Sequence, residues 1–221
     1  ANLGRMRGFT LLELSIVLVI IGLIVGGVVA GQELIRNAEL SSVLREYNQF
    51  NTAINSFRYK YNALPGDMKN ATDYWGVQVA SSNCRRSPTP AGSTATCDGD
   101  GDGRIEWDGD GGSGTSPGTE SARFWQHLAN ANLIEGHYYG TGGDGVATGL
   151  TSYWVCVGKN APASALEPAA WFPFYSDASE ASETGNSFMY GTRPCDASNP
   201  IDNQLPVMTP AELYQIDMKI D

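Results

Sequence analysis

Basic residues are scarce in this chain. Among its 221 residues, 14 lysines and arginines stand against 24 aspartates and glutamates, which gives a formal net charge of −10 at pH 7. Proteins that bind nucleic acids need clustered basic side chains to neutralise the phosphates. The composition therefore argues against a nucleic-acid partner. It fits a solvated acidic surface outside the cell that can attract divalent cations.

Histidine and cysteine are also rare, and no C-x-x-C pair occurs. With two histidines in the chain, a zinc site is not expected. An even number of cysteines outside the cytoplasm favours disulfides, and four cysteines allow three pairings. We favour Cys84–Cys97, which closes a short loop, and Cys156–Cys195, which joins two later segments. Free buried thiols are the alternative.

Patterns typical of catalysis are missing as well. The sequence contains no phosphate-binding loop, no dinucleotide fingerprint and no paired catalytic acids. Gly114–Gly118 matches G-x-S-x-G, but its Gly, Ser and Pro flanks do not supply the strand and helix that a nucleophile elbow requires. His127 and His137 have no paired Cys or Asp pattern nearby and are expected to be structural. We therefore predict no catalytic residues and a protein that is not an enzyme.

Charged residues are absent from Leu14 to Gln32, an apolar stretch of 19 residues. This length is close to the roughly 20 residues that cross a bilayer. Glu13 directly precedes the stretch, and a bare carboxylate in hydrocarbon costs several kcal/mol unless it is paired. The next basic residue, Arg36, lies roughly 35 Å further along a helix. The partner is therefore expected from elsewhere, such as a new α-amine on a neighbouring copy, made by cleavage after Gly8.

The residues around Glu13 closely resemble the processing site of type IV pilins and related pilin-like subunits. The matching residues are Arg5, Arg7, Gly8, Phe9, Thr10, Leu11, Leu12, Glu13, Leu14 and Ser15. In that family a prepilin peptidase cleaves after the glycine and methylates the new N-terminal amine. The glutamate then pairs with the N-terminus of a neighbouring subunit. The resemblance covers roughly the first 60 residues, and it implies that Gly8, Phe9 and Glu13 serve processing and assembly.

The apolar stretch continues into an amphipathic pattern. Apolar residues spaced alternately by three and four predict one buried helical face; they are Leu40, Val43, Tyr47, Phe50, Ile54, Phe57 and Tyr61. No proline precedes Pro65, so one helix is predicted from Thr10 to Tyr61. The expected organisation is a leader at 1–8, a hydrophobic membrane or filament-core helix at 9–31, its amphipathic continuation at 32–62 and a head domain at 63–221.

The head is expected to be α+β, with the long helix packed on an antiparallel β-sheet and with long loops. Residues 76–119 are rich in Gly, Ser, Thr, Asp and Pro and predict a long loop. The other expected elements are a turn at Leu64–Asp67, a helix at Ser121–Asn132, strands at Tyr153–Val157, Trp171–Tyr175 and Ser187–Tyr190, and a helix starting at Thr209-Pro210.

Alternating carboxylates and glycines begin at Asp98. Their spacing resembles the first half of an EF-hand calcium loop. The predicted ligands are Asp98, Asp100, Asp102, the carbonyl of Arg104, Glu106 and Asp108. Position twelve of the loop is Gly109, not a bidentate acid, so Asp108, Asp110 or Glu120 would have to close the shell. A structural calcium ion is expected, and a flexible solvated acidic loop is the alternative.

The leading hypothesis is a structural pilin subunit. It would reside in the inner membrane and then polymerise into an extracellular type IV pilus-like filament on a bacterial surface. The resemblance implies further copies of the chain, the prepilin peptidase and the pilus assembly platform as partners. The alternatives are a type II secretion pseudopilin, or a membrane-anchored calcium-binding adhesin that would need neither Gly8 nor Glu13.

Overall fold

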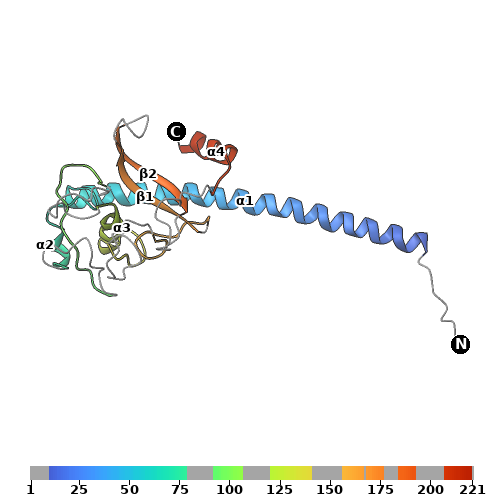
Figure 1. Ribbon diagram of the computed structural model, residues 1–221, viewed down its shortest axis with the longest axis horizontal. Helices are drawn as coiled ribbons and strands as arrows, with labels where there is room; N and C mark the ends of the chain where they lie inside the picture. Colours follow the sequence, from blue (N-terminus) through green and yellow to red (C-terminus); the bar gives the residue numbers. More distant parts are fainter. Residues whose placement is uncertain are drawn as a thin grey trace, which may run out of the picture. The chain divides into compact units, whose positions relative to one another are not determined.

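The computed structural model describes residues 10–78, 92–106, 120–140, 156–166, 168–176, 184–192 and 207–220. Its elements are α1 (Leu11–Tyr61), α2 (Ala71–Trp75), α3 (Glu120–Asn130), β1 (Ala169–Ser176), β2 (Gly185–Thr192) and α4 (Pro210–Ile220) (Figure 1). A long N-terminal helix combined with an antiparallel two-stranded sheet confirms the predicted α+β class.

Helix α1 is continuous over 51 residues, which confirms the single long helix predicted from the sequence. It ends where Asn62 takes a left-handed backbone conformation, with φ of 52°, shortly before Pro65. The chain forms two compact units, Ala1–Ser41 and Ser42–Asp221. The segments predicted from the sequence end at residues 31 and 62, whereas the two compact units meet between Ser41 and Ser42. The predicted boundaries therefore stay predictions.

Most of the large apolar side chains described in the first unit are exposed. The large apolar residues of α1 from Leu11 to Val29 are all exposed, Leu11 at 89% and Ile20 at 50%. In the part of the chain that the structure describes, α1 is the one helix that is long and apolar enough to cross a membrane. An exposed apolar surface of this extent needs lipid or other protein to cover it.

The second unit buries the amphipathic face of α1, as the three-four spacing predicts. Val43, Phe50 and Phe57 are buried. The ring of Phe50 contacts Trp125 of α3 at a centroid distance of 4.7 Å, and Tyr47 contacts Trp171 of β1 at 5.8 Å. The stripe is therefore the helix side of the core of the head.

The two strands coincide with two of the three predicted aromatic segments. Trp171 pairs with Tyr190 across the antiparallel ladder, and their rings lie 4.6 Å apart. The third predicted strand, Tyr153–Val157, falls mostly outside the described residues, and Val157 itself makes an isolated bridge to Ala161. The predicted helices at Ser121–Asn132 and after Thr209 are confirmed as α3 and α4, whereas the short α2 was not predicted.

A single carboxylate on α1 joins the helix to the sheet. Glu46 accepts hydrogen bonds from the hydroxyl of Ser164, from the backbone N–H of Ala165 at 2.7 Å and from Trp171 Nε1 at 3.1 Å. The helical pattern assigns Glu46 to the polar face, because sequence spacing does not show which polar side chains the head reaches. These three donors make Glu46 a structural residue of the head.

Replacing Glu46 by Ala is expected to destabilise the head, because the buried residues Ser164 and Trp171 lose a charged acceptor. The expected loss is about 2–4 kcal/mol, which lowers the Tm of the full chain in detergent by roughly 5–10 °C. The matched control is Gln49→Ala on the exposed face of the same helix, which is expected to change Tm by less than about 2 °C. Equal effects of the two substitutions in thermal unfolding would contradict this role.

Candidate functional site

Glu13 lies in the first turn of α1 and caps the helix. The backbone N–H and the hydroxyl of Thr10 both donate to Glu13 Oε2, at 2.8 and 2.9 Å, and the Glu13 N–H donates to Thr10 Oγ1 at 3.2 Å. This is a capping box, which satisfies donors that a helix start leaves unpaired. Thr209 and Glu212 form the same arrangement at α4. The T-x-x-E spacing was a signal for this partner that the sequence reasoning missed.

The cap changes how Glu13 must be interpreted, because it accounts for a carboxylate here without a neighbouring copy. Both hydrogen bonds to the side chain come from neutral donors and reach Oε2. Among the described residues, Oε1 accepts no hydrogen bond and no cation pairs with Glu13. The negative charge thus remains available to a partner. Gly8 and Phe9, the other predicted processing residues, lie outside the described residues.

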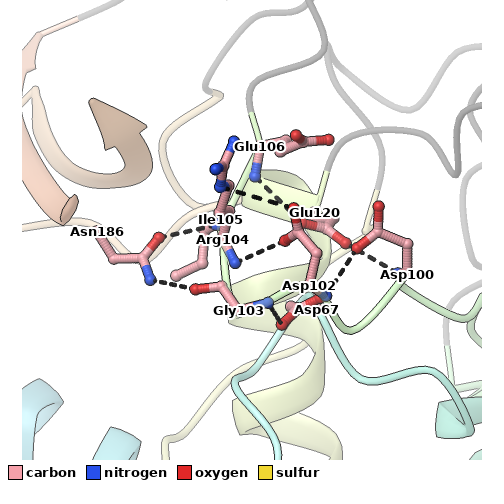
Figure 2. A network of polar contacts seen from close by, with 9 residues as sticks. All are labelled: Asp67, Asp100, Asp102, Gly103, Arg104, Ile105, Glu106, Glu120 and Asn186. Atoms are coloured by element: carbon pink, nitrogen blue, oxygen red, sulfur yellow. Dashed lines mark hydrogen bonds and ion pairs between the residues drawn. The ribbon is translucent and has the colours of Figure 1, made fainter. Parts of the chain in front are cut away.

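A second group of carboxylates gathers in the head. Asp67 follows the turn after α1, Asp100 lies in the glycine-rich loop and Glu120 is the first residue of α3. One carboxylate oxygen from each lies within 4.8 Å of the other two, and Figure 2 shows the three side chains converging from their separate segments. We call these residues the acidic cluster.

Two glycines let the three segments approach closely. Gly66 has a φ of +89°, and a Cβ there would lie 2.4 Å from the carbonyl oxygen of Glu120. A Cβ on Gly99 would lie 2.5 Å from the carbonyl carbon of Asp67. Contacts this short are impossible for a real side chain, so only glycine permits the backbone approach that brings the acidic cluster together.

A buried histidine holds the Gly66 turn in place. The Gly66 N–H donates to His127 Nδ1 at 3.0 Å, and His127 Nε2 lies 3.0 Å from Thr96 Oγ1. Because Nδ1 accepts, we place the ring proton on Nε2, where it is donated to Thr96, and the Thr96 hydroxyl donates to Gln126 at 2.8 Å. Burial lowers the pKa of His127 to about 3. His127 is therefore a neutral structural residue.

The oxygens of the acidic cluster are unequally satisfied. Glu120 accepts the backbone N–H groups of Asp100 at 3.2 Å and Glu106 at 3.1 Å. Asp67 Oδ2 accepts the Gly103 N–H at 3.0 Å, whereas the buried Oδ1 has no hydrogen-bond partner. Burial raises the pKa of Asp67. Burial also raises the pKa of Glu120 to about 8. The negative charges of Asp67 and Asp100 add to this rise, and the two N–H groups oppose it.

The structure distributes the predicted calcium ligands over different contacts. Asp98 accepts the backbone N–H and hydroxyl of Thr72, at 2.8 and 3.0 Å, in the first turn of α2. Asp102 accepts the Arg104 N–H at 2.8 Å and forms an exposed ion pair with the same residue. The other three side chains predicted as ligands lie in different places. Asp100 joins the acidic cluster, the Glu106 N–H donates to Glu120, and Asp108 lies outside the described residues.

The sequence pattern did not indicate Asp67 as a metal ligand. It indicated Glu120 only as one of three residues that could complete the calcium coordination shell. Asp67 and Glu120 each lie far along the chain from Asp100, and no local spacing links them. Each of the two predicted disulfides includes one cysteine outside the described residues. Cys97 and Cys156 are each disulfide-bonded, but Cys84 and Cys195 lie outside the described residues, so the pairing stays a prediction.

Comparison with known proteins identifies the N-terminal segment. Residues 3–29 match the family described as the prokaryotic N-terminal methylation motif. No curated protein and no solved structure matches the chain. The matched segment contains Gly8, Phe9 and Glu13, and it supports a type IV pilin-like or pseudopilin protein. It also implies processing by a prepilin peptidase, and with the apolar half of α1 it fits anchoring in a membrane.

The stability of the metal-free head is expected to fall as the pH rises from about 6.5 to 8. Below this window His127 opposes the effect of Glu120, because its pKa is about 3 in the folded head against an ordinary 6.5. Folded Glu120 keeps its proton up to about pH 8, whereas the unfolded chain loses it near the ordinary glutamate pKa. The folded state thus binds more protons than the unfolded chain across this window, and rising pH favours unfolding because unfolding releases a proton. Thermal unfolding in chelator should show this slope, reduced by Glu120→Gln but not by the exposed control Glu135→Gln. A slope unaffected by Glu120→Gln would contradict the assignment.

Proposed function

We propose that this chain is a subunit of an extracellular type IV pilus-like filament. The observation that carries the proposal is the methylation motif at residues 3–29, together with the exposed apolar side chains of α1 from Leu11 to Val29 within it. A segment that is processed, anchored and then buried between copies needs both features. The acidic head supplies the solvated outer surface.

Processing would create the positive partner of Glu13. The basic residues Arg5 and Arg7 hold the leader on the cytoplasmic side of the inner membrane, following the positive-inside rule. Cleavage after Gly8 then frees the amine of Phe9. The charge on Glu13, which Thr10 leaves unneutralised, attracts the amine of a neighbouring subunit. In a low-dielectric surround this attraction is far stronger than in water, and it fixes the axial position of the incoming subunit.

Burial of the apolar helices would then drive the bundle together. Glycines spaced by four residues allow close helix approach in lipid, and Gly22 and Gly26 have no atoms near the position of a Cβ. An assembly platform would extract the subunit from the membrane and add it to the growing filament. In the membrane, lipid would cover the apolar side chains of α1. In the filament, the α1 helices of other copies would cover the same side chains.

Two alternatives keep specific support. A type II secretion pseudopilin carries the same N-terminal motif, so the motif alone does not separate it from a pilin. A membrane-anchored calcium-binding adhesin is favoured by the capping box, because the cap explains Glu13 without any second copy. If the chain is a pseudopilin, deleting its gene would cause a secretion defect, and the wild type would show no surface filament. If it is an adhesin, the protein would remain monomeric.

Substitutions at the helix start separate the charge of Glu13 from its cap. Gln at the third helical position also forms a capping box, so Glu13→Gln keeps the cap and removes the charge. If assembly needs the ion pair, worth several kcal/mol when buried, Glu13→Gln should reduce sheared surface filaments about tenfold or more, as Glu13→Ala does.

The matched control is Thr10→Ala, which removes the side-chain cap at a cost of about 1 kcal/mol but keeps the charge. It should retain most filaments. Wild-type assembly by Glu13→Gln together with a defect in Thr10→Ala would show that Glu13 acts only as a cap. Immunoblots of whole cells control for subunit levels.

Mass spectrometry of the subunit from sheared filaments is expected to find an N-terminal peptide that begins at methylated Phe9. The cut exposes the amine that pairs with Glu13, so a subunit that retains Arg7 could not make this pair. Replacing Gly8 by a bulky residue should leave the leader in place and abolish filaments. Filaments built from uncleaved subunits would contradict the proposed assembly.

A further inference from the structure

The acidic cluster contains a buried oxygen with no hydrogen-bond partner. Asp67 is only 3% exposed, and its Oδ1 is paired with no donor, while its carboxylate converges with those of Asp100 and Glu120 (Figure 2). Leaving a buried acceptor unmatched costs the full desolvation of that group. We propose that Asp67, Asp100 and Glu120 bind one calcium ion.

Among the described residues, no Lys or Arg forms an ion pair with Asp67, Asp100 or Glu120, although the Lys69 side chain lies against Gly101. The hydrogen bonds of the three cluster residues are with backbone N–H groups, which are neutral. Three carboxylates so close together repel one another when ionised. A divalent cation would supply both the missing partner of Asp67 Oδ1 and the missing positive charge.

The donor set and its spacing favour calcium over other ions. Carboxylate oxygens without nitrogen or sulfur ligands suit hard cations. Magnesium usually keeps several waters and is bound through one or two carboxylates, whereas calcium takes six to eight oxygens in flexible geometry. Three carboxylates that each place one oxygen within 4.8 Å of the other two therefore favour calcium. Asp100 is exposed, which leaves room for water in the six to eight ligands that calcium takes.

The ion would join three segments that are distant in the chain. Asp67 belongs to the turn after α1, Asp100 to the glycine-rich loop and Glu120 to the start of α3. The loop contributes Asp100, so calcium would order residues that the sequence alone describes as a flexible acidic stretch. This site differs from an EF-hand loop, because two of its three carboxylates come from outside the repeat that begins at Asp98.

Calcium titration of the mature full chain in detergent, after removal of metal with chelator, tests the site. Saturation at about 100 times Kd should raise Tm by roughly 5–10 °C. Asp67→Asn and the exposed Asp100→Asn should each weaken calcium binding about tenfold or more, measured by calorimetry, since affinity depends on ligand charge. Near-UV circular dichroism of the buried tryptophans checks that each variant is folded.

The matched control is Asp102→Asn, which removes the same charge from the same loop but lies outside the acidic cluster. It should change Kd less than about threefold, since exposed charges are screened. The proposal is overturned if calcium neither binds nor raises Tm. It is also overturned if Asp102→Asn weakens binding as much as Asp100→Asn, or if magnesium at equal concentration reproduces the calcium shift.

Discussion

Burial of α3 on all sides is the constraint on which the head depends. Every residue from Glu120 to Leu128 is buried, including the polar side chains of Glu120, Gln126 and His127. Buried polar groups need partners inside the protein. They find them in segments with little regular structure: Gln126 donates to the carbonyl of Ala95, His127 accepts from Gly66 and Glu120 accepts from the glycine-rich loop. The irregular segments are ordered because α3 requires their backbone groups, and the apolar face of α1 supplies the other wall of the same core.

Glu13 in α1 and the acidic cluster in the head are carboxylates that pair with no Lys or Arg among the described residues. Glu13 stands at the start of an uncovered apolar helix, with Thr10 as a neutral cap. Asp67 and Glu120 stand inside the head, where burial favours their protonated forms. Glu46 shows the contrasting case, a carboxylate satisfied by donors of the head. For the first two places we propose partners from outside the chain, an amine of a second copy at Glu13 and a cation at the acidic cluster.

Local patterns were sufficient wherever one stretch of sequence determines one element. The uncharged run and the three-four spacing predicted α1 nearly to the residue, because both report the environment of a single helix. Aromatic segments predicted the core of both strands for the same reason. The site was predicted only in part: Asp100 came from the repeat of carboxylates, but Asp67 lies more than thirty residues earlier, beside a turn with no metal-binding pattern. Glu46 was assigned to a polar face because periodicity cannot show which polar groups meet donors from the head.

The sequence by itself determined the processing motif, the membrane-length apolar helix and the side of α1 that enters the core. These follow from residue type and spacing within one segment, where hydrophobic burial and helical geometry act locally. Only the tertiary structure decided that Asp67, Asp100 and Glu120 converge, and that Asp98 and Asp102 contact other groups instead. Their convergence depends on the close backbone approach at Gly66 and Gly99 and on the hydrogen bonds that buried His127 makes to Gly66 and Thr96. These contacts join segments that are far apart in the chain.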